Sequence, residues 1–283
     1  MVLFALEQYI AKGGLMLPID LILVRHGQSE GNVANKASER GDNSFFTPEF
    51  RQRHSRSFRL TDNGITQAMT AGEWLRKNVI MPLDRFYVSD YVRAKETAAY
   101  LVLPAAEWRS EFLLRERDKA LMDNCPFDEQ QKLYEFEQRQ YAIDPFLSYP
   151  AGGGESIAML CLRMRDFLNH LARECPDKRI IVVCHGHVMR ALQLELGNLG
   201  HDDFIRLDAS EDMPDRIRNC QILWYTRRDP DTGKIREPRI VAVRSICPWD
   251  PKGDYGWRKI ERRRYSNDEL MEEVSRYPRH ISG

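Results

Sequence analysis

The sequence predicts an α/β protein, a three-layer α/β/α sandwich with a mostly parallel central sheet. Apolar runs of strand length alternate along the chain with stretches of helical periodicity. Strands that alternate with helices pair in parallel, because each helix carries the chain back across one face of the sheet. A parallel sheet of this kind is covered on both faces, so we expect the strands to be buried.

The first half of the chain predicts two units of strand followed by helix. Residues 20–24 (DLILV) predict a short buried strand. Residues 61–79 predict a helix that begins at an N-cap, Thr61, and carries its apolar residues on one face. Residues 85–88 (RFYV) predict a second strand, and residues 91–103 a second helix that ends before a proline.

The second half continues the same pattern. Residues 155–174 predict a long helix entered through three glycines. Residues 179–183 (RIIVV) form the clearest strand pattern, and a helix is expected over residues 188–196. Two further strands, over residues 218–226 and 239–244, flank a turn that contains Pro and Gly.

Three segments do not follow this alternation of strands and helices, and they divide the chain. They are a polar insertion at 33–59, an insertion rich in Glu, Gln and Tyr at 117–149, and a tail at 248–283. We therefore expect one domain over residues 20–247, preceded by an extension over residues 1–19. Ser266 and Glu269 have the spacing of a capping box, which predicts a helix near the end of the tail. Long insertions are often lids or specificity elements, and decoration is the equal alternative.

The composition excludes several classes of protein. The 283 residues include 42 Lys plus Arg and 42 Asp plus Glu, so no overall field attracts nucleic acid or an anionic membrane. No apolar run reaches the roughly 18 residues that span a bilayer, and residues 1–15 lack the basic start of a secretory signal. The 6 cysteines form no CxxC pair, which is typical of a reduced protein. We expect a cytoplasmic protein without nucleic-acid or membrane partners, in which any anion site is local.

Two of the predicted strands end in the same way. The strand LILV is followed by RHG at residues 25–27, and the strand IIVV is followed by CHG at residues 184–186. In an open parallel sheet, ligands bind beyond the carboxyl ends of the strands. We therefore expect His26 and His185 to converge on one crevice, each followed by a glycine where the chain turns sharply.

Further patterns accompany these histidines in a fixed order. They are RHGQSEGN at 25–32, LTDNGITQA at 60–68, SDYVRAKETA at 89–98, LRE at 114–116, GGES at 153–156 and VCHG at 183–186. Together they resemble the motifs of the histidine phosphatase superfamily, which includes phosphoglycerate mutases and phosphatases similar to them. The resemblance covers about residues 20–226. It implies a phosphoglycerate mutase-like fold and a pocket made by Arg25, His26, Arg93 and His185.

The chemistry of these side chains suits a phosphomonoester. A neutral imidazole can attack phosphorus if its other ring nitrogen donates to a backbone carbonyl, and we expect His26 to be this nucleophile. A phosphohistidine would form and be hydrolysed by water. Forked, permanently charged guanidinium groups bind phosphoryl oxygens well. The resemblance implies that Arg25, Asn32, Arg93, His185 and Gly186 contact the phosphate.

Glu116 is the expected general acid. Protonation of a leaving oxygen calls for a carboxylic acid whose pKa is raised by partial burial. The flanking charges act in conflicting directions, and Glu111 or Asp123 could take this role if the loop is placed differently. A solvated surface turn is the alternative for this segment, as a surface arginine is for Arg93.

A cysteine-dependent phosphatase is the sharpest rival. Cys184 and Arg190 satisfy the C-x5-R pattern of enzymes in which a thiolate attacks phosphate. That loop needs smaller residues than the chain has between them, and the rival leaves His26, Arg93 and Glu116 unexplained. We expect Cys184 to be a small buried hydrophobe.

Within the family, hydrolysis competes with mutase-type phosphoryl transfer. Phosphoglycerate mutases usually have a glycine-containing segment after the acid, whereas this chain has none at residues 117–123, and His187 is typical of the phosphatase branch. These features favour hydrolysis. A catalytically silent protein that binds phospho-ligands or acts as a scaffold is a further alternative, which the intact set of site residues disfavours.

The expected partner is a small phosphorylated substrate, either a sugar phosphate, a nucleotide or a phosphopeptide. The basic insertion, with Arg51, Arg53, Arg56 and Arg59, would hold a second anionic group if it folds over the pocket; a solvated loop is equally compatible. The pair His185 and His187 lacks further ligands at suitable spacing, so we expect no metal and no cofactor. The oligomeric state is left open, with a homodimer as one alternative.

Overall fold

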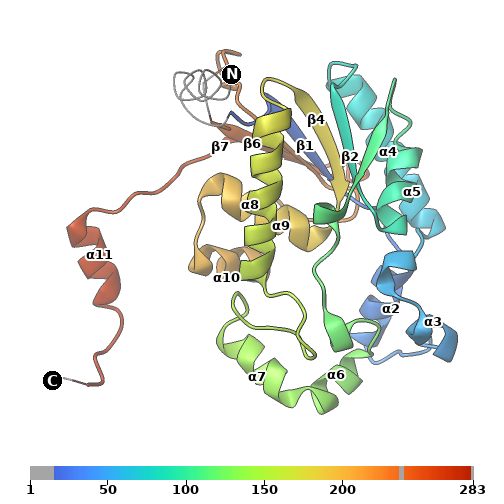
Figure 1. Cartoon of the computed structure of the whole chain (residues 1–283), viewed down its shortest axis with the longest axis vertical. Coiled ribbons are helices and arrows are strands. Elements are labelled where there is room, and N and C mark those ends of the chain that lie inside the picture. Colours follow the sequence, from blue (N-terminus) through green and yellow to red (C-terminus); the bar gives the residue numbers. More distant parts are fainter. Residues whose placement is uncertain (1–15, 236–238, 282–283) are drawn as a thin grey trace, which may run out of the picture.

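The computed structural model describes residues 16–235 and 239–281 and places a seven-stranded sheet at its centre. Figure 1 shows the sheet, whose strand order is β3-β2-β4-β1-β5-β6-β7. The strands are β1 (Asp20–Arg25), β2 (Arg85–Ser89), β3 (Trp108–Glu111), β4 (Arg179–Cys184), β5 (Ile222–Thr226), β6 (Ala242–Ile246) and β7 (Asp254–Lys259). Strands β1 to β4 and β6 run in one direction, and β5 and β7 run in the other. The sheet is therefore mixed: the three pairs from β3 to β1 are parallel, and the three pairs from β1 to β7 are antiparallel.

Helices cover both faces of this sheet, as Figure 1 shows. The helices are α2 (Glu30–Ser38), α3 (Pro48–Gln52), α4 (Asp62–Asn78), α5 (Val92–Tyr100), α6 (Phe127–Leu133), α7 (Glu135–Ile143), α8 (Ile157–Glu174), α9 (Gly186–Gly197), α10 (His201–Ala209) and α11 (Asn267–Val274). Leu21 and Leu23 of β1 pack in a cluster with α8 and α9, whereas Ile22 and Val24 pack with α4 and α5. The three-layer sandwich is thereby confirmed, because side chains of one strand alternate between two cores.

The predicted strands and helices are all present, with changes at their ends. The Thr61 side chain caps α4 as expected, by accepting from the amide of Gly64. The helix expected from residue 155 begins later, because the side chain of Ser156 caps it by accepting from Met159. The strand expected from residue 218 begins only at Ile222, because the preceding residues turn beside the end of β1.

Several elements were not predicted. The edge strands β3 and β7 carry several charged residues and lack a clear apolar pattern. Helix α2 lies largely within the segment expected to be a polar insertion, and α10 is short and acidic at its start. The strand expected over residues 239–244 is displaced to β6, since its position is set by pairing with β5.

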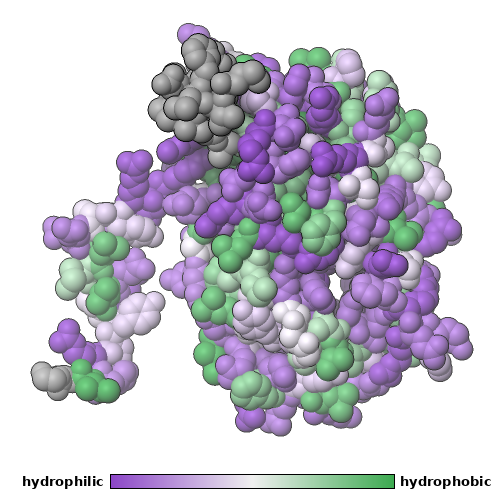
Figure 2. All heavy atoms as spheres, in the orientation of Figure 1, coloured by the Kyte–Doolittle hydropathy of each residue, from purple (hydrophilic) through white to green (hydrophobic). Residues whose placement is uncertain are grey.

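The segments outside the sandwich partly follow expectation. The insertion at 117–149 contains the helices α6 and α7, and the tail ends in α11 with the predicted capping box of Ser266 and Glu269. Figures 1 and 2 show α11 apart from the sandwich, with hydrophobic residues on its surface. Most of the expected N-terminal extension lies outside the described residues. Among the described residues, no helix has the length and apolar character needed to cross a bilayer.

Candidate active site

The carboxyl ends of β1 and β4 bring the two predicted histidines together. The two strands are parallel neighbours, with Arg25 opposite Cys184. The next residue on each strand is a histidine, so His26 and His185 leave the same edge of the sheet. Their ring centroids lie 5.1 Å apart at an interplanar angle of 61°. The prediction that these histidines converge is confirmed.

His26 is held as a neutral imidazole with a defined tautomer. Its Nδ1 lies 2.7 Å from the carbonyl oxygen of Gly27, which can only accept, so Nδ1 carries the proton. Its Nε2 then accepts a hydrogen bond of 3.1 Å from Nε of Arg93. Burial, followed by the charge of Arg93, holds the pKa of His26 well below its usual value. Nε2, the ring nitrogen that does not contact the carbonyl of Gly27, therefore keeps its lone pair at neutral pH.

His185 is fully buried and is oriented by a serine. Its Nε2 lies 2.8 Å from Oγ of Ser89, and this oxygen also accepts from the amide of Tyr91 at 3.3 Å. The hydroxyl proton is thus free to go to Nε2, which leaves Nδ1 as a donor. Nδ1 has no hydrogen-bond partner among the described residues, and burial holds the pKa of His185 well below its usual value. Ser89 was not singled out from the sequence, although it begins the motif at 89–98.

The two predicted arginines flank the histidines. Arg93, at the start of α5, donates to His26 and also from Nη1 to the carbonyl of Ser55 at 2.8 Å. Arg25 donates from Nη1 to the carbonyl of Ile217 at 2.6 Å, while its buried Nε has no hydrogen-bond partner within residues 16–235 and 239–281. Each guanidinium is anchored by a backbone carbonyl and retains donors for an anion.

Glu116 lies beside this group, but in a different protonation state from the one expected. Burial raises the pKa of Glu116, yet the interaction with nearby His187, together with the charge of Arg93, outweighs it and holds the pKa well below the usual value. Nδ1 of His187 lies 3.7 Å from Oε1 of Glu116. The expectation of a raised pKa is therefore wrong for the site without substrate, because the surrounding cations stabilise the carboxylate.

A buried ion pair supports the loop that carries Glu116. Arg163 of α8 makes hydrogen bonds of 2.8 and 2.6 Å to the carboxylate of Glu155, and both side chains are 8% exposed. The same guanidinium donates to the carbonyls of Leu113 and Arg115. Glu155 of the GGES motif at 153–156 thus stabilises, through Arg163, the loop that carries Glu116.

The site opens into a cavity of about 950 Å³, lined by Arg25, His26, Arg93 and Glu116 but not by His185. The charged side chains of its wall are mostly cationic. The cations are Arg25, Lys36, Arg93, Arg117, Lys119, Arg190, Arg216 and Arg218, and the anions are Glu116, Asp123 and Asp208. A chain without net charge therefore carries a local field that favours anions, as its sequence predicts.

Asn32 and Gly186 occupy defined positions beside the site. Asn32 lines the cavity, and its Oδ1 accepts from the amide of Ser29 at 3.1 Å and from Nδ2 of Asn219 at 3.0 Å. Gly186 begins α9 and lies against Arg25, where an added Cβ would be 3.5 Å from the guanidinium carbon. Asn219, which also donates to the carbonyl of His26 at 3.1 Å, was missed, because it lies outside the recognised motifs.

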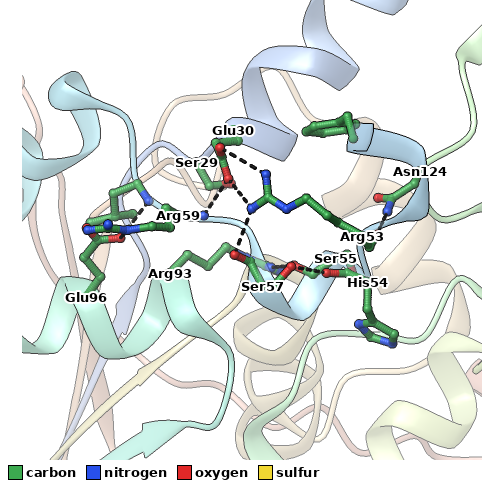
Figure 3. Close-up of polar contacts among 12 residues, drawn as sticks. Ser29, Glu30, Arg53, His54, Ser55, Ser57, Arg59, Arg93, Glu96 and Asn124 are labelled. Carbon is green, nitrogen blue, oxygen red and sulfur yellow. Dashed lines mark hydrogen bonds and ion pairs between the residues drawn. The ribbon is translucent and has the colours of Figure 1, made fainter. Parts of the chain in front are cut away.

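The basic insertion does not supply a second anion site through its arginines. Figure 3 shows Arg53 directed at Glu30 and Arg59 at Glu96, with shortest distances of 2.9 and 2.6 Å. Arg51 pairs with Glu129 of α6 at 2.7 Å. The cavity lining does not include Arg51, Arg53, Arg56 or Arg59. Carboxylates elsewhere in the fold compensate three of these four charges, which sequence spacing could not indicate.

The insertion acts on the site through its backbone instead. The carbonyl of Ser55 accepts from Arg93, and Ser55 lines the cavity beside His26. The side chain of Asn124 donates to the carbonyl of Arg53, which joins the two insertions at the site (Figure 3). The insertion at 33–59 therefore positions the guanidinium of Arg93.

Cys184 has the properties of a core residue. It is fully buried in the cluster beneath α8 and α9, and burial raises the pKa of its thiol. A thiol in this state is a poor nucleophile, which disfavours the rival mechanism. Within the described part of the chain, no group of three or more His, Cys, Asp or Glu side chains could hold a metal ion.

Comparisons with known proteins agree with this geometry. Residues 21–213 match the family model of the histidine phosphatase superfamily (branch 1). The chain is 26% identical over 209 residues to a 2,3-bisphosphoglycerate-dependent phosphoglycerate mutase of Parvibaculum lavamentivorans, covering 70% of this chain and 89% of the relative. It is 29% identical over 182 residues to a metal-independent phosphoserine phosphatase of Arabidopsis thaliana, covering 62% of this chain and 68% of the relative.

A solved structure supports the fold. The mycobacterial glucosyl-3-phosphoglycerate phosphatase aligns with a TM-score of 0.56 and 23% identity, covering 73% of this chain and 89% of that protein. The relatives thus include both phosphatases and mutases, which all act on phosphorylated compounds. Since the family model spans the sandwich from β1 through α10, the chain belongs to the histidine phosphatase superfamily.

Proposed function

We propose that this chain is a phosphomonoester hydrolase that works through a phosphohistidine on His26. The observation that carries the proposal is the state of this imidazole, whose Nδ1 donates to Gly27 and whose Nε2 keeps its lone pair beside Arg93. A neutral nucleophile avoids the repulsion that an anionic one meets from a phosphate dianion. The cationic wall of the cavity supplies the attraction.

In the first step, Nε2 of His26 forms a bond to phosphorus while the bond from phosphorus to the ester oxygen breaks. Arg93 gives up its hydrogen bond to Nε2 and turns its donors to the phosphoryl oxygens, together with Arg25. Nδ1 of His185 donates to the same group. Arg25 is anchored by the carbonyl of Ile217 and His185 by Ser89 before substrate arrives, so only Arg93 has to reorient.

Glu116 gives its proton to the departing oxygen, which leaves as an alcohol. The carboxyl gains this proton when substrate binds, because a dianion next to it raises its pKa. In the second step, water attacks phosphorus, the bond to His26 breaks, and Glu116 accepts the proton of the water. The products are the alcohol and inorganic phosphate.

Hydrolysis is favoured over transfer to a retained product. The segment after Glu116 lacks the glycine-containing pattern of the mutases that the sequence resembles, and the cavity is wide enough to admit water. The phosphoserine phosphatase relative is compatible with this choice. The mutase relatives make phosphoryl transfer between substrate positions the second candidate.

The test is turnover of p-nitrophenyl phosphate, sugar phosphates, nucleotides and phosphopeptides in the presence of EDTA. We expect release of inorganic phosphate and an acid-labile phosphoenzyme, both lost in His26→Ala. The variant His280→Ala, at an exposed position, is the histidine control. Turnover without the acid-labile label, or label retained in His26→Ala, would contradict the mechanism. Conversion of a phosphoglycerate isomer without phosphate release would establish the mutase alternative.

A further inference from the structure

We propose that Trp249 binds the leaving group, and that the substrates of this site are phosphomonoesters whose leaving group carries a planar aromatic ring. The proposal rests on the phosphatase activity proposed above. Trp249 follows the last strand residues of β6 and lies outside the part of the chain that matches the family model. Neither the family motifs nor the family model includes it.

Residues 217–219 connect Trp249 by hydrogen bonds to His26 and Arg25. The indole Nε1 of Trp249 donates to the carbonyl of Asn219 at 2.7 Å. The side chain of Asn219 donates in turn to the carbonyl of His26 at 3.1 Å. The carbonyl of Ile217, two residues earlier, accepts from Arg25 at 2.6 Å. Asn219 therefore links the indole to the loop of His26, and Trp249 and His26 line the same cavity.

The indole is held rigidly and still presents apolar surface. The guanidinium of Arg218 lies over one face of the indole, 5.1 Å from the ring centroid, which leaves the other face for a ligand. Arg218 is itself fixed by Asp250 at 2.7 Å and by the hydroxyl of Tyr255 at 2.8 Å. The single polar atom of the ring is satisfied by Asn219. Trp249 nevertheless remains 38% exposed and lines the cavity.

An exposed and immobilised indole in a polar cavity is the kind of surface on which aromatic rings stack. Stacking buries apolar area without an entropy cost for the fixed side chain. The nearby cations also complement a ring that is joined to an anionic group. The cavity, at about 950 Å³, leaves space for such a group beyond the phosphate.

Adenosine 5′-monophosphate and ribose 5-phosphate test this directly, since they share the phosphate and the ribose and differ in the base. Their inhibition constants are measured against p-nitrophenyl phosphate turnover. We expect the nucleotide to bind about 10-fold more tightly, within the range that base–aromatic stacking provides. This difference between the two inhibition constants should persist in Trp249→Phe, which keeps a ring. It should disappear in Trp249→Leu, which keeps only apolar volume.

Trp257→Leu is the matched control, because Trp257 packs against Trp224 and does not line the cavity. It should retain the difference. Equal inhibition constants in the wild type, or a difference that survives in Trp249→Leu, would overturn the inference. Absence of p-nitrophenyl phosphate turnover would instead count against the proposed function, and the dissociation constants of the same two ligands, measured by calorimetry, would still decide the role of Trp249.

Discussion

Nε of Arg93 donates a hydrogen bond of 3.1 Å to Nε2 of His26. A guanidinium is charged at every accessible pH and can only donate, so His26 must accept and is neutral. The contact protects the nucleophilic lone pair and keeps a cation next to the position where phosphorus must bind. The same contact has measurable consequences for stability.

Acidification should destabilise the fold through His26 and His185. Burial, the largest cause, holds the pKa of both below 6.5 in the folded state. Between the folded and unfolded values, the unfolded chain binds protons that the folded chain does not, so stability is full above pH 6.5 and falls as the pH drops below it. Each group adds a slope of up to about 1.4 kcal/mol per pH unit. Urea unfolding from pH 7.5 to 5.5 measures this slope.

The variant His26→Gln should reduce this slope by the share of one group, and His185→Gln should do the same. His280→Gln, at an exposed position, is the control. A slope in both site variants equal to that of the wild type would contradict neutral histidines in the fold. The pKa of Glu116 is also depressed in the fold, so its contribution to the free energy of unfolding should be lost only as the pH falls below about 4.5.

Glu116→Gln should slow hydrolysis according to the leaving group. We expect kcat/KM for an alkyl phosphate, which reports phosphoryl transfer to His26, to fall by about 10²- to 10⁴-fold, the usual contribution of a general acid. p-Nitrophenolate leaves without protonation, so kcat/KM for p-nitrophenyl phosphate should fall much less. The role of Glu116 in the second step is common to both substrates and affects kcat instead. Steady-state kinetics on both substrates measure the difference, and an equal loss of kcat/KM on the two would assign Glu116 to binding or structure.

The main features of the fold and of the phosphate pocket could be predicted because they depend on local patterns. A buried strand followed by histidine and glycine specifies a position at the edge of the sheet, and two such strands specify a pair. The helix starts at Thr61 and Ser266 follow from capping residues that act within one turn. The edge strands β3 and β7 could not be predicted, since their existence depends on pairing partners distant in the sequence.

The errors at the site have one common cause. The low pKa of Glu116 depends on His187, and the neutralised charge of Arg51 depends on Glu129, a residue of the other insertion. Ser89 and Asn219 orient the histidines through contacts over 96 and 193 positions of the chain. Charge compensation between distant segments is set by the fold, so composition and spacing do not contain it.

The ion pair of Glu155 and Arg163 should be important for both stability and rate. Arg163→Met leaves a buried carboxylate unpaired and removes donors from the carbonyls of Leu113 and Arg115, which should destabilise the fold by about 3–5 kcal/mol. Because this loop carries Glu116, kcat should also fall, while the inhibition constant of inorganic phosphate should change little. The double variant Glu155→Gln/Arg163→Met should regain part of the stability. A full loss of phosphate binding would show that the ion pair supports the whole pocket and not only the loop that carries Glu116.

Neutralisation of Arg51 should have the same small effect on every substrate. Its guanidinium pairs with Glu129, both side chains are substantially exposed, and it does not line the cavity. We expect Arg51→Gln to change the free energy of unfolding by at most about 1 kcal/mol. KM for a bisphosphorylated sugar and for p-nitrophenyl phosphate should change by the same factor. Arg216→Gln is the comparison, because Arg216 lines the cavity and its loss should raise KM mainly for the bisphosphate. If Arg51→Gln raised KM for the bisphosphate alone, the insertion would have to close over the bound substrate with its ion pair broken.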